Sequence, residues 1–385
     1  MQPIRDIARS SFTIRLLLVN EIEPVEAYPT LAARVPFAMS PTALDRLRRA
    51  KADSTLTAYR GDLRRFLAWA GSRDLIPAEL TPVTTGPIDD TRNAAAFARL
   101  LSTYGALHTI AAEYVSHLAD EGKAPSTIER ALAAVAVAHR AGGAGRLATE
   151  AARDVLRSHR RDSADNGRTV RKAKPVTVTA LRAMVEVLDV TTLAGLRDRA
   201  IIVLGFALGA RRSEAAGLDI ADLEFTDEGL QVLIRRSKTD QEAAGRPVAL
   251  PYGSHPETCP VRTVQAWLAA LAERAFTSGA LFRRIDKHGK LGRTPHGRGS
   301  ADGRISSQAV AIVVKRTALR AGLDAASAFS GHSLRRGFAT ETYRAGADQL
   351  RIARHAGWKD GSATLAGYIE DVDRWKANPL AGVGL

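Results

Sequence analysis

The stretch GHSLRRGFATETYRAG, residues 331–346, combines cationic side chains with the apolar spacing of a helix. Leu334 and Phe338 lie four residues apart, so they share a face that can pack against the rest of the protein. His332 and Arg335 lie three residues apart on another face, with no carboxylate close to them in the sequence. Because burying unpaired charge is costly, the pair indicates either a solvated helix face or a site that binds an oxyanion.

The overall composition favours a polyanionic partner. The chain has 385 residues, enough for two domains, and a formal net charge of +14 with a pI of about 10.3. Nucleic acid is the first candidate and an anionic membrane surface the second. No apolar run approaches the roughly 20 residues that span a bilayer, and FTIRLLLVNEIEP is too short and interrupted for a signal peptide. We therefore expect a cytoplasmic, nucleoid-associated protein with no membrane partner.

The sequence offers little support for a disulfide framework or a metal site. Cys259 is the single cysteine, and the nine histidines are scattered without metal-ligand spacing. No GxxxxGK[ST] phosphate-binding loop and no carboxylate cluster suited to two metal ions is present. No cofactor is therefore expected.

Periodicity and composition predict a mainly α protein with a small antiparallel β-sheet. The predicted parts are an N-terminal arm at 1–38, a helical domain at 39–160, a basic linker at 161–176, a mixed α+β domain at 177–372 and a tail at 373–385. In the first domain, we predict helices at 54–74, 106–121, 126–141 and 147–158, with a loop at 81–90. In the second, we predict strands at 230–236 and 246–250, a helix that starts near 177–180, and helices at 195–209, 260–275, 306–321, 333–345, 348–355 and 362–370.

The segment around the predicted linker is basic and poor in large apolar residues. Its cations can follow a phosphate backbone, and a solvated hinge explains them equally well. The candidate DNA-binding residues are Arg160, Arg161, Arg171, Lys172 and Lys174.

Two cationic segments precede the histidine–arginine helix. In LGARRSEAAGL, residues 208–218, Arg211 and Arg212 follow an apolar stretch, and Glu214 offers them a structural ion-pair partner. In RRSKTDQEAAGRPVALP, residues 235–251, Lys238 lies near the turn between two strands. An ammonium group at a turn is either solvated or reaches a base or phosphate. Both segments remain open to a structural and to an anion-binding interpretation.

The last candidate is Tyr368 in WKDGSATLAGYIE, where Ser362 can cap a short helix. A lone tyrosine in an apolar stripe is usually part of a core. Beside two arginines, however, its phenol could attack a phosphodiester, because arginines neutralise the charge that grows on the phosphate oxygens. A phenol has a reference pKa of about 10, so it needs a base or a positive site. His332 or the arginines can supply this, and Lys238 can protonate the leaving sugar oxygen.

In this order the segments resemble the signature of the tyrosine recombinase, or phage integrase, family. GARRSE resembles its first box, Lys238 with RPVALP its hairpin lysine, and HSLRR its second box. AGWKD with GYI resembles the final box, where Trp358 stands in the place of a histidine in many members and His355 is a rival for that place. The resemblance covers about residues 40–372 and assigns the catalytic set Arg211, Lys238, His332, Arg335, Trp358 and Tyr368.

The resemblance implies a fold and a reaction. It implies a two-domain C-clamp, in which a helical core-binding domain and a catalytic domain enclose double-stranded DNA. A homotetramer joins two sites, with room for accessory DNA-bending proteins. Tyr368 forms a 3′-phosphotyrosyl link, strands exchange through a Holliday junction, and neither ATP nor metal is required. The tail at 373–385 is expected to dock on a neighbouring protomer.

Three other functions remain open from the sequence. One is a non-catalytic DNA-binding protein of the same fold, which would have no use for the phenol of Tyr368. Another is a type IB topoisomerase-like enzyme, which shares the chemistry. The third is a membrane-surface protein, suggested by charge alone.

Overall fold

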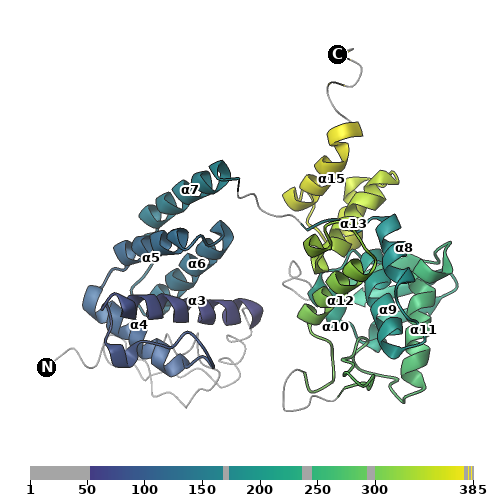
Figure 1. Ribbon diagram of the computed structural model, residues 1–385, viewed down its shortest axis with the longest axis horizontal. Helices are drawn as coiled ribbons and strands as arrows, with labels where there is room; N and C mark the ends of the chain where they lie inside the picture. The colour runs from purple at the N-terminus through teal and green to yellow at the C-terminus, as the bar shows by residue number, and fades with distance from the viewer. Residues whose placement is uncertain are drawn as a thin grey trace, which may run out of the picture. The chain divides into compact units, whose positions relative to one another are not determined.

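The structure is a computed structural model that describes residues 53–167, 173–235, 245–292, 300–376, 380 and 383. The chain divides into two compact units, Met1–Thr169 and Val170–Leu385, each with its own hydrophobic core (Figure 1). The described elements are mainly helices with one small antiparallel sheet, which confirms the predicted fold class. None of the described helices has the length and apolar character needed to cross a membrane.

The first unit is helical throughout its described part. Its α-helices are α3 (Asp53–Ser72), α4 (Asp90–Tyr104), α5 (His108–Asp120), α6 (Pro125–Ala141) and α7 (Glu150–Asp165). Aromatic contacts fix how the first three pack, since the Phe66 ring on α3 lies 6.2 Å from Phe97 on α4 and 5.1 Å from Tyr114 on α5. Three of these helices match predictions to within a few residues, and α4 was not predicted.

Helix α4 illustrates a signal that periodicity alone misses. Asp89 caps its first turn, and the carboxylate accepts a hydrogen bond from Arg92 N at 2.9 Å. Much of its buried face is alanine, a residue of high helix propensity that gives little of the large-apolar signal by which a buried helix face is recognised in a sequence. The cap after the Pro–Thr–Gly loop was the available sequence signal.

The predicted linker at 161–176 is wrong at both ends. Helix α7 continues to Asp165, and it buries the polar residues His159 and Ser163, so its polar composition concealed a packed face. His159 Nε2 lies 2.9 Å from Lys123 O, which accounts for the buried ring. At the other end Val176 is fully buried, and its N–H donates to Ser333 O at 3.0 Å.

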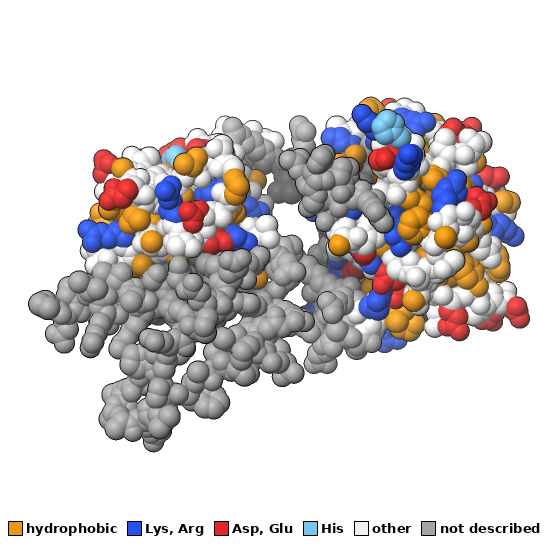
Figure 2. All heavy atoms as spheres, turned by 90° about the horizontal axis from the view of Figure 1, so that it is seen from below, with side chains coloured by type: hydrophobic (Ala, Val, Ile, Leu, Met, Phe, Trp, Pro, Cys, Tyr) orange, Lys and Arg blue, Asp and Glu red, His pale blue; other side chains and the backbone are white. Residues whose placement is uncertain are grey.

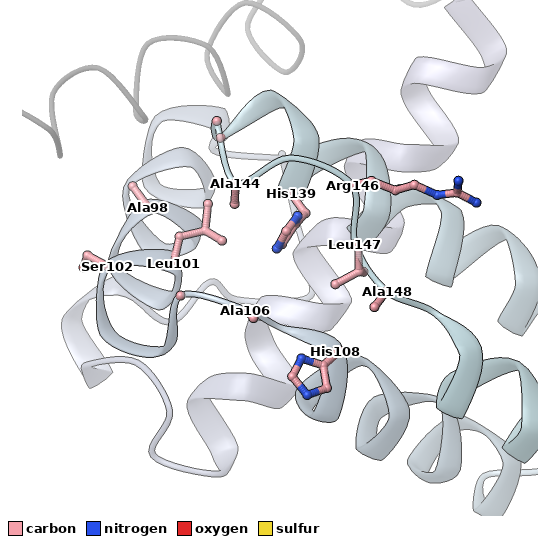
Figure 3. A pocket seen from close by; sticks show the side chains of 13 residues that line it. Ala98, Leu101, Ser102, Ala106, His108, His139, Ala144, Arg146, Leu147 and Ala148 are labelled. Atoms are coloured by element: carbon pink, nitrogen blue, oxygen red, sulfur yellow. The ribbon is translucent and has the colours of Figure 1, made fainter.

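A pocket in the first unit is enclosed by α4, α6 and the turns that precede α5 and α7 (Figure 3). Small apolar side chains such as Ala98 and Leu101 form much of its wall. His139 is 3% exposed there, and its Nδ1 lies 3.2 Å from Gly145 O in the turn after α6. The Nδ1 contact closes that turn, whereas Nε2 of the same ring is buried without a hydrogen-bond partner. None of the described candidate catalytic residues lines the pocket.

The second unit contains the sheet, with strand order β1-β2-β3. Strands β1 (Leu223–Thr226), β2 (Gly229–Ile234) and β3 (Arg246–Pro251) pair antiparallel, with Val232 opposite Val248. Leu230, Val232 and Ile234 alternate inward along β2, as a sheet with one covered face requires. Strand β1 was not predicted, because its residues are exposed or only partly buried and carry no apolar alternation.

The helix Pro260–Ala272 packs against β2 and β3 of this sheet, and the described helices of the unit position the candidate site. They are α8 (Val178–Glu186), α9 (Leu193–Ala207), α10 (Arg212–Gly217), α11 (Pro260–Ala272), α12 (Ser307–Arg320), α13 (Gly331–Arg344), α14 (Gln349–Ala356) and α15 (Ala363–Lys376). Leu334 of α13 belongs to the main core, and Phe338, one turn later, belongs to a smaller core shared with α14 and α15. Helix α13 therefore joins the two cores.

Candidate active site

Helix α13 begins with a reciprocal cap that orients its cationic residues. Ser330 Oγ accepts from His332 N at 3.2 Å, and Ser333 Oγ accepts from Ser330 N at 2.9 Å. His332 is exposed in this first turn, whereas Arg335, one turn later, is 3% exposed. The two residues keep their helical spacing but differ sharply in burial.

Arg335 is held from two sides and keeps one donor nitrogen unused. Its Nη1 donates to Gly209 O at 2.6 Å and to Ala356 O at 2.7 Å. Its Nη2 is buried and has no hydrogen-bond partner. Burial, followed by the nearby charge of Arg211, lowers the pKa of Arg335 to about 9. A guanidinium in this situation is suited to receive an anion, which would satisfy the remaining donor and offset the positive charge.

Close packing at Gly209 brings the first arginine segment to Arg335. Gly209 has φ of +55°, and a Cβ there would lie 2.6 Å from the Phe338 ring, so only glycine fits. Arg211 follows two residues later as the N-cap of α10, and its Nη1 lies 2.5 Å from Glu214 Oε1. The structural pairing with Glu214 therefore exists, and it places Arg211 beside Arg335. Arg212 bonds instead to Gln308 Oε1 at 3.2 Å, which supports the choice of Arg211.

Trp358 connects Arg335 to Tyr368. The guanidinium carbon of Arg335 lies 3.7 Å from the Trp358 ring centroid, a cation–π arrangement. The Trp358 and Tyr368 rings meet edge to face, 6.2 Å apart at an angle of 76°. Tyr368, on α15, is partly buried. Its phenol lies close enough to Arg335 that the negative charge of a phenolate would favour the charged form of the guanidinium. The structure thus brings Arg211, Arg335, Trp358 and Tyr368 together.

His355, the rival of Trp358, has a structural environment. Its ring stacks on Phe338 at 4.8 Å, and its Nε2 lies 2.9 Å from Ala207 O. Because a carbonyl only accepts, this nitrogen carries the proton. Burial lowers the pKa of His355 below its usual value. These contacts favour a packing role for His355 and leave the tryptophan in the site.

The sequence analysis overlooked Arg246, which begins β3. Its Nη1 donates to His355 O, and its Nη2 is buried without a partner. A Cβ on Gly357 would approach Arg246 Nε to 2.9 Å, so the guanidinium packs directly against this turn. Burial lowers the pKa of Arg246, and its charge in turn lowers the pKa of Arg335. Arg246 therefore adds a third arginine around Glu214, the carboxylate that the described part of the chain places near Arg246 and Arg335.

The remaining predicted residues are distributed between the units or lie outside the description. Lys238, Arg171 and Lys172 are outside the described residues. Arg160 and Arg161 are exposed on α7 of the first unit, where Arg160 pairs with Glu129 at 3.0 Å.

Lys174 belongs to the second unit, and its contacts are structural. Its Nζ donates to Asp324 O at 2.9 Å and lies 5.9 Å from the centroid of the Phe329 ring. These contacts tie the ammonium group to its own unit.

Comparisons with known proteins identify the family of this chain. The model of the phage integrase family matches residues 176–374. The integrase/recombinase xerD homolog of Selenomonas ruminantium is 32% identical over 337 residues, covering 87% of this chain and 86% of that protein. Recombinase cre of Escherichia phage P1 is 26% identical over 272 residues, covering 68% of this chain and 75% of the relative.

A solved lambda integrase dimer bound to a COC′ core site is also similar. It covers 86% of this chain at 16% identity with a TM-score of 0.49, a likeness on which no conclusion rests. The family match, by contrast, spans the segments that carry Arg211, His332, Arg335, Trp358 and Tyr368. With that match and the extended identity to the Selenomonas relative, the chain belongs to the phage integrase family and is a tyrosine recombinase.

Proposed function

We propose that this protein is a site-specific recombinase that cuts and rejoins double-stranded DNA through a covalent link to Tyr368. The observation that carries the proposal is the series Arg335–Trp358–Tyr368, with an unused Arg335 donor beside Arg211. A packed core has no need for a buried arginine with a free N–H, whereas a phosphate oxygen would satisfy it.

The first chemical step forms one bond and breaks one. The phenolic oxygen of Tyr368 attacks the phosphorus, and its proton passes to His332. The bond from phosphorus to the 5′ oxygen breaks, and that oxygen takes a proton from Lys238. Arg211 and Arg335 bind the non-bridging oxygens, where negative charge increases during attack. The product is a 3′-phosphotyrosyl link and a free 5′-hydroxyl.

Rejoining reverses this step with a different hydroxyl. A 5′-hydroxyl from the partner duplex attacks the phosphotyrosyl bond, so the bond energy is conserved and no ATP is consumed. Exchange of one pair of strands gives a Holliday junction, and exchange of the second pair resolves it. Four protomers on two DNA sites would provide the four tyrosines that this sequence of steps needs.

Surface charge supports a DNA partner for both units. Figure 2 shows Lys and Arg side chains on the described surface of each unit, with acidic side chains among them. With a net charge of +14, phosphate contacts should contribute much of the affinity, which should fall steeply with salt. We propose that the two units clamp the duplex and that the candidate DNA-binding cations contact its backbone. These are Arg160, Arg161, Arg171 and Lys172, whereas the ammonium group of Lys174 is already bound within its own unit.

The test uses duplex DNA that carries the recombination site and a nick close to the cleavage position. Such a substrate loses a short fragment after cleavage, so the covalent complex accumulates and is counted on a denaturing gel. The wild-type protein should become linked to the 3′ end of the cleaved strand. Tyr368→Phe should bind the same DNA in a gel-shift assay without forming a covalent product.

The controls distinguish an enzyme from a DNA-binding protein. Tyr343→Phe is a matched variant, because it also removes a tyrosine hydroxyl. Tyr343 on α13 donates to Asp373 on α15 at 2.8 Å. Tyr343→Phe should retain covalent trapping. Specific binding by the wild type without trapping would contradict the enzymatic proposal, as would equal trapping by Tyr368→Phe.

A further inference from the structure

Arg336 follows Arg335 in the sequence, but it contacts a different part of the unit. It is 8% exposed, and its Nη2 forms an ion pair with the carboxylate of Asp371 on α15. Its guanidinium carbon lies 5.3 Å from the centroid of the Tyr368 ring. Tyr368 and Asp371 are three residues apart on one helix, so they share the face that Arg336 contacts.

The other nitrogen of the same guanidinium is attached to a different segment. Arg336 Nη1 donates to Ala173 O at 2.6 Å. The following residues are also fixed, because Lys174 N donates to Ala328 O at 3.1 Å and Val176 N to Ser333 O at 3.0 Å. A Cβ on Gly337 would lie 2.1 Å from Val176 O, so only glycine permits this close approach. Residues 173–176 therefore provide a firm support for the Arg336 side chain.

Apolar packing alone would hold α15 less specifically. Leu365 and Ile369 attach the helix to the small core formed with α13 and α14. Such contacts are non-directional and tolerate small rotations or shifts along the helix axis. An ion pair with hydrogen-bond geometry fixes direction, and its burial makes replacement of one partner costly. The polar contact lies within one turn of the nucleophile, where small displacements affect the reaction most.

We propose that Arg336 is a positioning residue for Tyr368, which it orients through a cation–π contact with the phenol ring and by holding Asp371 against residues 173–176. This inference rests on the proposed function, in which Tyr368 is the nucleophile. Arg336 itself contacts neither the phosphate nor the transferred proton. Its effect is on the geometry of attack.

The experiment compares Arg336→Gln with Arg344→Gln in the covalent-trapping assay at saturating protein. Arg344 is a matched control, because it forms an ion pair with Glu341 on the same helix. Arg336→Gln should lower the maximal trapping rate by about 10²-fold, the size expected for a displacement near 1 Å. Its DNA affinity should stay within about twofold of the wild type, and Arg344→Gln should trap at the wild-type rate.

Two further variants separate positioning from loss of folding. Asp371→Asn keeps the size of the side chain and should also lower the trapping rate, even if Arg336→Gln fails to fold. The double variant Arg336→Gln/Asp371→Asn should trap no more slowly than the slower single variant, because both changes break the same ion pair. Arg336→Lys should recover part of the rate, since it retains the positive charge.

The outcomes also distinguish this inference from the proposed function. If the wild type forms no covalent product, the proposed function fails. If the wild type traps and folded Arg336→Gln and Asp371→Asn trap as fast as Arg344→Gln, the positioning role of Arg336 is wrong and the nucleophile assignment stands. A uniform loss of DNA affinity with an unchanged maximal rate would likewise contradict positioning.

Discussion

The two units use buried ion pairs in different ways. In the first unit Asp62 is 1% exposed and is bound by Arg65 and Arg130, whose side chains are 48% and 43% exposed. In the second unit Glu214 is equally buried, but its partner Arg211 is only 16% exposed. Arg335, a short distance away, is 3% exposed.

The difference concerns where the positive charge is solvated. Arginines that bind a buried carboxylate from the protein surface keep much of their hydration, so their pairing can be explained by stability. The arginines around Glu214 have lost most of theirs. Among the described residues, Glu214 is the acidic group that acts on Arg246 and Arg335, and its single charge cannot neutralise three guanidinium groups. A dehydrated excess of positive charge has an explanation if an anion arrives to share it.

The largest effect is expected from Arg335→Gln. Removing a donor that serves the developing charge on phosphate should lower the covalent-trapping rate by about 10³-fold. The midpoint temperature of thermal unfolding should fall only modestly compared with the loss of trapping rate, because the variant also removes a buried charge that is costly to the folded state. A trapping rate within tenfold of the wild type would show that the dehydrated arginine is structural, as in the first unit.

Asp62→Asn should lower the stability of the protein and leave its trapping rate unchanged. The substitution weakens charge-assisted hydrogen bonds to Arg65 and Arg130, with an expected loss of about 2 kcal/mol in the free energy of unfolding. The maximal trapping rate on saturating DNA should not change, since Asp62 and its two arginines belong to the first unit and the candidate catalytic residues belong to the second. Denaturant unfolding measures the loss of stability and covalent trapping measures the rate, both on the same preparation. A lower trapping rate with unchanged stability would contradict the comparison.

Arg246→Gln should produce a smaller catalytic effect than Arg335→Gln. The variant removes a nearby charge without removing a group assigned to the phosphate, so we expect about a tenfold lower trapping rate. The pKa of Arg335 should rise, because Arg246 contributes to lowering it. Arg246→Lys should restore most of the rate. Equal trapping rates for Arg246→Gln and the wild type would show that Arg246 has no part in the reaction.

The smallest effect is a pH dependence at His355. Its folded-state pKa lies below the usual 6.5. The unfolded chain therefore binds more protons in mild acid, and this contribution to stability is lost as the pH falls through about 6.5 toward the folded value. Thermal unfolding should show a weaker decline between about pH 7 and pH 5 in His355→Gln than in the wild type. Identical profiles would mean that His355 is not buried in its neutral form.

Elements with runs or stripes of large apolar residues could be predicted from the sequence, whereas alanine-rich, polar or short elements were missed or given the wrong length. The prediction at 195–209 corresponds to α9, and the prediction at 333–345 corresponds to α13. Strand β1 is short and exposed on most positions, so it has no pattern before it pairs with β2. Helix α7 extended beyond its prediction because tertiary contacts bury its polar residues.

Some residues of the site could likewise be predicted from the sequence, and others could not. The resemblance of the ordered segments to the family signature selected Arg211, Arg335, Trp358 and Tyr368, which the structure places in one cluster. Arg246 gave no signal, because an arginine at the start of a strand is usually solvated and only folding brings it to His355 O. The second arginine of HSLRR was equally uninformative, since its partners Ala173 and Asp371 are distant in the sequence.

The central claim is that Tyr368 attacks a DNA phosphate held by Arg211 and Arg335. The most direct test is to trap the wild-type protein on the nicked substrate, digest both components and identify the modified peptide by mass spectrometry. The account predicts a nucleotide joined through its 3′ phosphate to the peptide that contains Tyr368. A modification on another residue, or a link through a 5′ phosphate, would contradict it.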